Sequence, residues 1–129
     1  MKVGVWTVRA EAQSLAQRLA AGIDAELFPL AESGKNREAF REAFHECDGW
    51  VLVMTTGIAT RYLDGLTESK KSDPAVVVID EAARFSISLL SGHEGGANEL
   101  AYLVAALTGA TPVITTATRS RPGRRLNSS

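Results

Sequence analysis

Two short apolar runs, residues 50–54 and 75–79, constrain the fold of this chain more than any other feature. The first reads Trp-Val-Leu-Val-Met and the second Ala-Val-Val-Val-Ile, with no polar residue in either. A strand with one solvated face would carry a polar residue at every second position, so these runs are typical of strands buried on both faces. The chain is therefore expected to contain a sheet that is covered by helices on both sides.

Helical segments alternate with the apolar runs along the chain. Ala12, Leu15, Leu19 and Ile23, for example, follow the spacing of one face of a helix, and Gly22 is expected to end that helix. This alternation predicts a three-layer α/β/α sandwich with a mostly parallel sheet of five or six strands. The strands are expected at residues 3–8, 25–28, 50–54, 75–79, 85–90 and 111–115.

The segment 80–84 is too short for a helical crossover, so strand 85–90 is expected to pair antiparallel with strand 75–79 and to make the sheet mixed. In strand 85–90, apolar residues alternate with Ser86 and Ser88, which is typical of a strand with one more polar face. Ligands of such sheets bind outside the carboxyl ends of the parallel strands. Polar residues stand at three such ends: 7–9, 55–57 and 115–116. The loop after residue 90 joins them only if strand 85–90 is the one that runs parallel to the others, and the sequence leaves both arrangements open.

Length and charge limit the classes of function. The 129 residues fit one α/β domain over residues 1–117 and a basic tail of disordered composition over residues 118–129. The tail holds four of the 14 basic residues and no acid, so the rest carries 10 basic against 15 acidic residues, a net charge of −5. An acidic domain argues against nucleic-acid binding. No apolar run approaches the roughly 20 residues that span a bilayer. A lone cysteine, Cys47, suits a reducing compartment, and we expect a cytoplasmic protein with no membrane partner.

The densest chemical feature is the segment 91–99, Ser-Gly-His-Glu-Gly-Gly-Ala-Asn-Glu. Its glycines let the backbone come close to a ligand, and the helix that follows offers free N–H groups to an anion. His93 can move a proton near neutral pH, and Asn98 with the backbone amides can stabilise an oxyanion. The alternative is a plain glycine turn with His93 bonded to backbone. Ser91 is interpreted as a turn residue, because no Gly-x-Ser-x-Gly elbow surrounds it.

A second candidate anion site follows strand 50–54. Thr56 and Gly57 open a helix there, and Arg61 can grip a carboxylate with two hydrogen bonds. The alternative is helix capping with a solvated Arg61. No metal site is predicted, since His45 and Cys47 are two residues apart on a helix and do not face each other. Cys47 instead completes an apolar stripe and is interpreted as a core residue.

Four segments carry a family resemblance: Thr56-Gly57-Ile58 with Arg61, then residues 72–80, residues 87–101 and residues 109–118. In this order they strongly resemble the cobalamin-biosynthesis family CbiG, cobalt-precorrin-5A hydrolase. The match runs from about Trp50 to Thr118. Its most specific string is Leu-Leu-Ser-Gly-His-x-Gly-Gly-Ala-Asn, which begins at Leu89.

The resemblance implies a place in the oxygen-independent route to vitamin B12, with a cobalt-containing tetrapyrrole as substrate. Members of the family open a δ-lactone on ring A and release a two-carbon piece as acetaldehyde. The many carboxylates of such a substrate agree with the anion sites that the residues themselves suggest. Cobalt enters with the substrate, so the resemblance implies no protein-bound cofactor.

The resemblance also suggests roles for the residues, with His93, Glu94 and Asn98 as the catalytic group. His93 would act as general base on the water that attacks the lactone carbonyl. The amides around Gly95 and Gly96, with Asn98, would hold the oxyanion, and His93 or Glu94 would relay a proton as the two-carbon unit leaves. The expected substrate-binding residues are Thr56, Gly57, Arg61, Ser91, Gly92, Gly95, Gly96, Thr115 and Thr116.

The chain departs from the family pattern in three places. The family usually has a further C-terminal domain, a glycine where Ala82 and Ala83 stand, and an acidic residue where Arg119 begins the tail. Two functions therefore stay open: the hydrolase, alone or with a separate C-terminal partner protein, and a non-catalytic tetrapyrrole-binding domain. A weaker third alternative is an unrelated anion- or nucleotide-binding module. An exposed strand edge in a small domain is also compatible with a homodimer.

Overall fold

The computed structural model describes residues 1–117, and the basic tail expected at 118–129 lies outside the described residues. Among the described residues, no helix is long and apolar enough to cross a membrane. The strands are β1 (Val3–Thr7), β2 (Glu26–Leu27), β3 (Gly49–Val53), β4 (Ala75–Ile79), β5 (Phe85–Leu90) and β6 (Thr111–Val113). The α-helices are α1 (Gln13–Gly22), α2 (Asn36–Ala43), α3 (Thr56–Leu63) and α4 (Ala97–Thr108), with short 3-10 turns at Ala10–Ala12 and Phe44–Glu46.

The six strands form one mixed sheet in the order β2-β1-β3-β4-β5-β6. The pairs among β2, β1, β3 and β4 are all parallel, whereas β5 is antiparallel to β4 and β6 is parallel to β5. The predicted mixed sheet and antiparallel pair are confirmed. The question that the sequence left open is also resolved, because strand 75–79 runs with the others and strand 85–90 runs against them.

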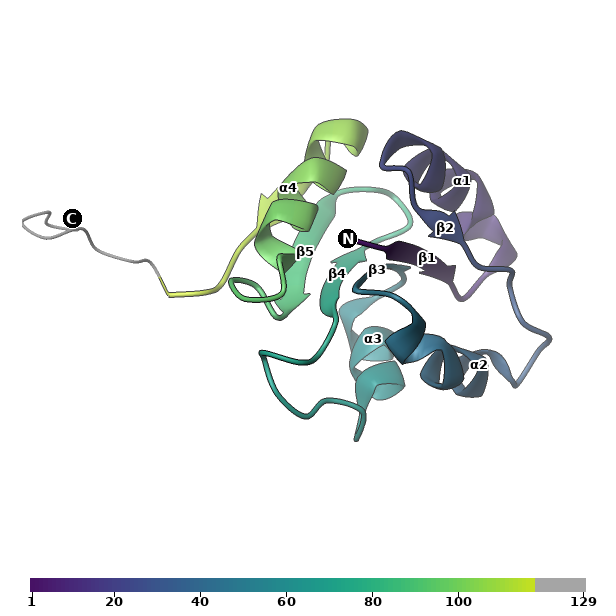
Figure 1. Ribbon diagram of the computed structural model, residues 1–129. Coiled ribbons are helices and arrows are strands. Elements are labelled where there is room, and N and C mark those ends of the chain that lie inside the picture. The colour runs from purple at the N-terminus through teal and green to yellow at the C-terminus, as the bar shows by residue number, and fades with distance from the viewer. Residues whose placement is uncertain (118–129) are drawn as a thin grey trace, which may run out of the picture.

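Helices cover both faces of the sheet, as the three-layer prediction requires (Figure 1). Helices α1 and α4 pack on one face against Val51, Val53 and Val77, and helices α2 and α3 pack on the other against Trp50 and Leu52. Alternate residues of β3 and β4 thus enter two different cores, and every residue of both strands is buried. This double burial explains why the two runs are continuously apolar.

Strand β5 has one more polar face, as predicted, and the structure shows which face that is. Ser86 and Ser88 are 0% and 6% exposed and lie beneath α4, whereas Phe85 and Leu89 are 46% and 36% exposed on the other face. The hydroxyl of Ser86 donates to the carbonyl of Ala101, so the serines on the covered face are hydrogen-bonded. The more polar face of this strand is therefore the buried one.

Two residues of α4 also differ from the expected core. The helical spacing of residues 100–107 predicts Leu100, Leu103, Val104 and Leu107 on the inward face, but Leu103 and Leu107 are 50% and 40% exposed. Helix α4 buries chiefly Ala97, Leu100, Ala101, Val104 and Ala105. Three of these five are alanines, so the face of α4 that packs on the sheet consists mostly of small side chains. The larger Leu103 and Leu107 stay outside.

Cys47 is a core residue, as expected, with 4% of its surface exposed. Burial raises the pKa of its thiol from the ordinary 9.0 to about 11, and the nearby Glu26, Glu46 and Asp48 act in the same direction. Because only the thiolate reacts, two pH units leave about a hundredfold less nucleophile than in an exposed thiol. We expect slow labelling of native protein by a thiol reagent at pH 8 and fast labelling in denaturant. Equal rates would show that Cys47 is accessible.

Candidate functional site

The directions of the strands separate the predicted site residues into two groups. Thr56 and Gly57 follow β3 and lie at the carboxyl ends of the parallel strands β1, β3 and β4. The segment 91–98 follows β5, which runs the opposite way. It therefore lies at the amino ends of β1, β3 and β4, together with residues 115–116 after β6. The structure therefore brings the glycine-rich segment and Thr115–Thr116 together and leaves Thr56, Gly57 and Arg61 elsewhere. The expectation that residues 115–116 lie with 7–9 and 55–57 is wrong, because β6 runs in the direction of β5 and against β1, β3 and β4.

The glycine-rich loop, residues 91–96, is built around the carbonyl of Ser91. This oxygen accepts hydrogen bonds from the N–H groups of Gly95 and Ala97, both at 3.1 Å, and Ser91 itself has a left-handed φ of 59°. The N–H of Asn98 donates to the carbonyl of Gly92 at 3.1 Å. Three amides near the start of α4 are thus bonded within the loop. Within the described residues of this loop, the N–H groups of Gly92, His93, Glu94 and Gly96 have no such backbone bond, so these groups can serve an anion.

Close packing explains two of the glycines. A Cβ at Gly92 would lie 2.6 Å from Thr116 Cγ2 and 2.7 Å from Asn98 Oδ1. A Cβ at Gly95 would lie 2.5 Å from Ser91 Cβ and 3.0 Å from the Ser91 carbonyl oxygen. These distances leave no room for a side chain. The motif is therefore a structural requirement of the loop, whatever chemistry it also performs.

Asn98 connects three elements through its side chain. The Ser88 hydroxyl on β5 donates to Asn98 Oδ1 at 2.7 Å, and Asn98 Nδ2 donates to Thr116 Oγ1 at 2.9 Å. The carboxamide oxygen is therefore in use, and one hydrogen of the amide group is left for other partners. Thr116 is thus held beside the loop, whereas Thr115 is exposed.

His93 and Glu94 project from the loop and are exposed. His93 Nε2 lies 3.3 Å from the carbonyl oxygen of Ala117, and Lys70 Nζ lies 3.6 Å from Glu94 Oε1. Lys70 comes from the loop between α3 and β4 and is not among the site residues expected from the sequence. An imidazole, a carboxylate and an ammonium thus lie on one polar loop cluster, with the groups needed to move protons and bind carboxylates.

Asp73 holds the Lys70 loop in place. Its carboxylate is in a buried residue, 7% exposed, and it accepts from the N–H groups of Glu68 at 2.9 Å and Ser69 at 3.1 Å. The Ser91 hydroxyl donates to the Asp73 carbonyl at 3.3 Å, which links this loop to the glycine-rich loop. The two loops therefore share one support.

Replacing Asp73 by alanine is expected to lower the free energy of unfolding by about 1–3 kcal/mol, because the part-buried N–H groups of Glu68 and Ser69 lose a charged acceptor. Urea denaturation measures this change. Asp64→Ala, at an exposed position of the same connection, is the matched control and should stay within about 0.5 kcal/mol of wild type. Equal effects of the two changes would contradict the supporting role of Asp73.

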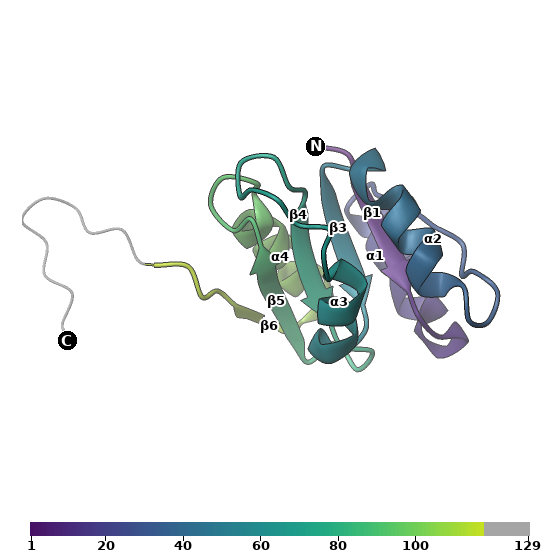
Figure 2. The ribbon, with the colours of Figure 1, turned by 90° about the horizontal axis from the view of Figure 1, so that it is seen from below.

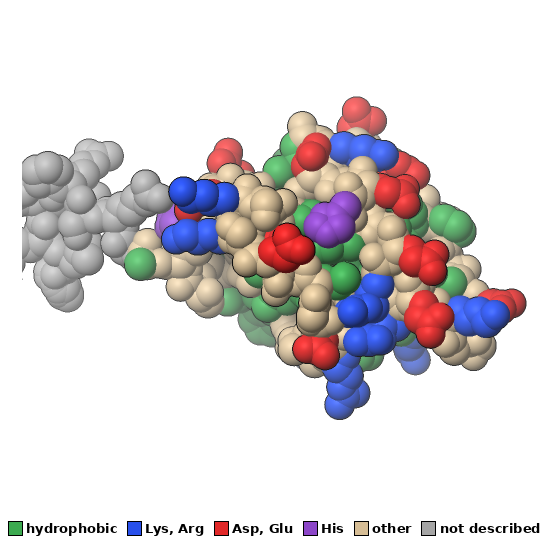
Figure 3. Space-filling view, turned by 60° about the horizontal axis from the view of Figure 1, so that its bottom comes forward, with side chains coloured by type: hydrophobic (Ala, Val, Ile, Leu, Met, Phe, Trp, Pro, Cys, Tyr) green, Lys and Arg blue, Asp and Glu red, His purple; other side chains and the backbone are tan. Residues whose placement is uncertain are grey.

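Arg61 does not lie near the helix start, where the sequence placed it. It is in the last turn of α3, its side chain is exposed, and its carbonyl accepts from Arg37 Nε at 2.9 Å. Basic and acidic side chains are interspersed on the face that α2 and α3 form (Figure 3). Thr56 and Gly57, by contrast, do open the helix, and Thr55 caps it by accepting from the N–H of Ile58 at 3.2 Å.

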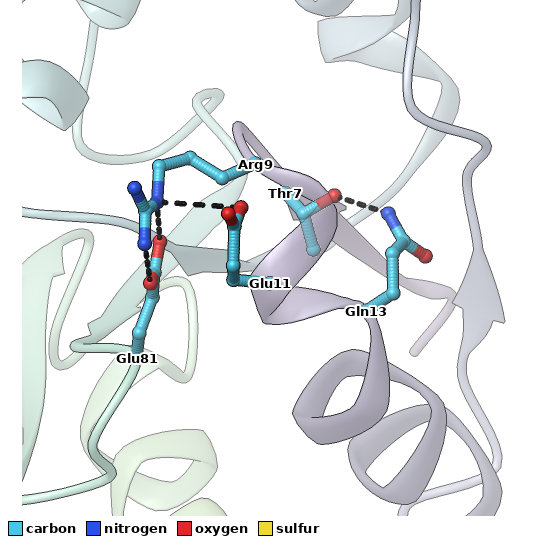
Figure 4. Close-up of polar contacts among 5 residues, drawn as sticks. All are labelled: Thr7, Arg9, Glu11, Gln13 and Glu81. Carbon is cyan, nitrogen blue, oxygen red and sulfur yellow. Dashed lines mark hydrogen bonds and ion pairs between the residues drawn. The ribbon is translucent and has the colours of Figure 1, made fainter.

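A cleft of about 370 Å³ lies at the carboxyl end of β3, away from the glycine-rich loop, with Met54, Thr55 and Ile58 in its lining. Arg9, after β1, reaches across to Glu81, after β4, with two hydrogen bonds of 2.9 and 3.0 Å (Figure 4). Because β1 and β4 flank β3, this ion pair crosses over the cleft. Arg84, which also lines the cleft, is paired with Asp80 at 2.9 Å. Both arginines are thus already neutralised by carboxylates, so the cleft offers less to an anion than its arginines suggest.

Within residues 1–117, no group of three or more His, Cys, Asp or Glu side chains is placed to hold a metal ion. His45 and Cys47 in particular differ in burial, the first exposed and the second in the core.

Comparison with known proteins gives the family of the chain. Residues 38–119, more than half of the sequence, match the family described as cobalamin synthesis G N-terminal. The chain belongs to this family. The matched residues include the glycine-rich loop, helix α4 and strand β6 of this cobalamin synthesis G N-terminal domain.

Two curated relatives are cobalt-precorrin-5A hydrolases. The Salmonella typhimurium protein is 55% identical over 78 residues, which are 60% of this chain and 22% of that protein. The Priestia megaterium protein is 46% identical over 85 residues, 66% of this chain and 23% of that protein. A solved structure of a cobalamin biosynthesis protein G homolog from Sulfolobus solfataricus superposes with a TM-score of 0.73 at 25% identity, over 88% of this chain and 36% of that one. The chain thus spans about a fifth to a third of these relatives.

Proposed function

We propose that this chain supplies the glycine-loop part of a cobalt-precorrin-5A hydrolase, which opens the ring A δ-lactone and releases acetaldehyde. The observation that carries the proposal is the family membership together with the two relatives of that name, whose matched stretches have up to 55% identity. The loop cluster of His93, Glu94 and Lys70 supports it, because lactone hydrolysis needs a base, a proton relay and donors for carboxylates.

In this proposal His93 takes a proton from the water that attacks the lactone carbonyl. The oxyanion that forms is held by the N–H groups of Glu94 and Gly96, since the N–H of Gly95 is bonded to Ser91. Asn98 holds the loop against β5 and the segment after β6. The amide hydrogen of Asn98 that is left over donates to the same oxyanion. Glu94 passes a proton as the two-carbon unit leaves, and Lys70 pairs with a carboxylate of the substrate.

The substrate-binding roles divide between the two edges of the sheet. Ser91, Gly92 and Thr116 shape the loop cluster, and Thr115 presents an exposed hydroxyl beside it. Thr56, Gly57 and Arg61 contact a substrate only if it extends around the sheet to the α3 side. The cobalt ion belongs to the substrate in this scheme.

A second function is favoured by one observation: His93 and Glu94 lie on an exposed loop surface. In that role the domain binds the tetrapyrrole, and another polypeptide closes the site and performs the reaction. Enclosure matters because a low-dielectric, water-excluded site strengthens the electrostatic stabilisation on which catalysis depends.

Anaerobic reaction in oxygen-18 water separates the two functions. The hydrolase proposal predicts a shift in the absorption spectrum of cobalt-precorrin-5A on binding and one heavy oxygen in the new carboxylate of the pigment. Binding without incorporation favours the tetrapyrrole-binding domain. A spectrum unchanged at any protein concentration would contradict both functions.

A further inference from the structure

An apolar stripe runs along one face of β5 and β6. In the antiparallel register Ile87 lies opposite Val78, whose side chain enters the core under α2 and α3, so Ile87 points to that face. Phe85 and Leu89 share the face by strand alternation, and the irregularity that pairs Leu90 with Val76 turns Leu90 to the same face. On β6, Val113 pairs with Ile87. We call Phe85, Ile87, Leu89 and Val113 the β5 stripe.

No described helix covers the β5 stripe. Helix α4 packs on the other face of β5, and α3 lies over the neighbouring strands, so β5 and β6 face outward in the view from below (Figure 2). Phe85 and Leu89 are 46% and 36% exposed, and Ile87 and Val113 are partly exposed. A cleft of about 280 Å³ between α3 and β5, lined by Leu63, Leu89 and Leu90, continues the stripe toward α3. One face of two strands therefore lacks the layer that covers the rest of the sheet.

The size of the stripe argues against a second copy of this chain as its cover. A fully exposed aromatic side chain offers about 150–250 Å², so four side chains that are at most half exposed present on the order of 300 Å² in total. A stable dimer buries about 800 Å² on each partner. A helix suits the stripe better, since two strands about 4.8 Å apart are as wide as a helix of about 10 Å diameter.

The longer relatives provide such a polypeptide. The matched stretches are 22% and 23% of two hydrolase relatives, and their match is to the N-terminal domain of the family. Strand β6, the last element described, ends at Val113 within the β5 stripe. After β6 the chain reaches the glycine-rich loop, where the Ala117 carbonyl oxygen lies 3.3 Å from His93 Nε2. This loop directly follows Leu90, so whatever comes after residue 117 in a relative starts near the Leu89 end of the stripe, at a high effective concentration.

We propose that the β5 stripe is the docking surface for the following part of the cobalt-precorrin-5A hydrolase polypeptide, which packs a helix with an apolar side against Phe85, Ile87, Leu89 and Val113. The helix completes the layer that α2 and α3 begin. This inference concerns packing and stands independently of the reaction proposed for the glycine-rich loop.

Thiol labelling compares coverage of the stripe in the two kinds of protein. Phe85→Cys and, separately, Leu89→Cys are made in this 129-residue chain, and the aligned residues are changed to cysteine in the full-length Priestia megaterium relative. Labelled peptides are followed by mass spectrometry. We expect rapid labelling in this chain and labelling at least about a hundredfold slower in the relative, because the thiol must wait for local opening there. Glu42→Cys, on the exposed polar side of α2, is the matched control and should label rapidly in both.

Three results would overturn the proposal. The first is equally rapid labelling of the stripe in both proteins, which means that the relative leaves it bare. The second is slow labelling in this chain that becomes rapid on dilution, which means that a second copy is the cover. The third is equal slowing of Glu42→Cys and the stripe variants in the relative, which means that the effect is not specific to this surface. Two separate stripe positions keep the test valid if one variant misfolds.

Discussion

Replacing His93 by alanine is expected to lower the rate of acetaldehyde release from cobalt-precorrin-5A by about two to four orders of magnitude, the range that a general base contributes. His93 is exposed on the glycine-rich loop, and its Nε2 is 3.3 Å from the Ala117 carbonyl oxygen, so the ring has a defined position and little structural burden. The free energy of unfolding should therefore change by no more than about 0.5 kcal/mol. Anaerobic initial rates and urea denaturation measure the two quantities.

The matched control for this prediction is His45→Ala. His45 is the second histidine of the chain, and it is also exposed, but it lies on the 3-10 turn Phe44–Glu46 and packs against the Phe44 ring at 5.0 Å. It should leave the rate unchanged. A His93→Ala protein that turned over at the wild-type rate would remove His93 as the base, and a rate lost equally in both variants would point to a general effect on folding.

Replacing Gly95 by alanine is expected to lower the free energy of unfolding by about 2–3 kcal/mol. The new Cβ would meet the Ser91 Cβ at 2.5 Å and the Ser91 carbonyl oxygen at 3.0 Å. Backbone cannot rotate away as a flexible side chain does, so the loop must move and the two hydrogen bonds to the Ser91 carbonyl weaken. The same movement displaces His93 and Glu94, and we expect the rate of acetaldehyde release to fall as well.

Gly57→Ala is the control for the Gly95 change. Gly57 lies in the first turn of α3, and the nearest atom to its added Cβ is Thr55 Oγ1 at 4.0 Å, an ordinary contact. Alanine stabilises a helix position by up to about 1 kcal/mol relative to glycine. In urea denaturation the free energy of unfolding should therefore fall for Gly95→Ala and rise for Gly57→Ala. A Gly95→Ala protein as stable as wild type would show that the loop has space that its contacts do not indicate.

The layers of the fold were predictable from sequence because strands that are buried on both faces, such as β3 and β4, are continuously apolar. The face of β5 was not, since polarity alone cannot show that the hydroxyls of Ser86 and Ser88 find partners in Ala101 and Asn98. Small polar residues under a helix and large apolar residues outside it reverse the usual inference. The exposure of Leu103 has a related cause, because helical spacing gives the angle of a residue but not how closely its helix approaches the sheet.

The candidate site was predictable in its residues and not in its arrangement. The segment 91–98 contains the loop, the exposed His93 and the connecting Asn98. The separation of Thr56 from His93 depends on the direction of β5, which the sequence left open. Lys70 reaches Glu94 from a loop 24 residues earlier, and such long-range pairs have no local signal in a sequence.

The decisive measurement is acetaldehyde release when this chain is incubated anaerobically with cobalt-precorrin-5A. We expect release that exceeds a no-protein blank, that increases in proportion to protein concentration, and that the Gly95→Ala change reduces. Absence of acetaldehyde at protein concentrations that bind the pigment completely would contradict the claim that the chain is a hydrolase, and would leave it a tetrapyrrole-binding domain.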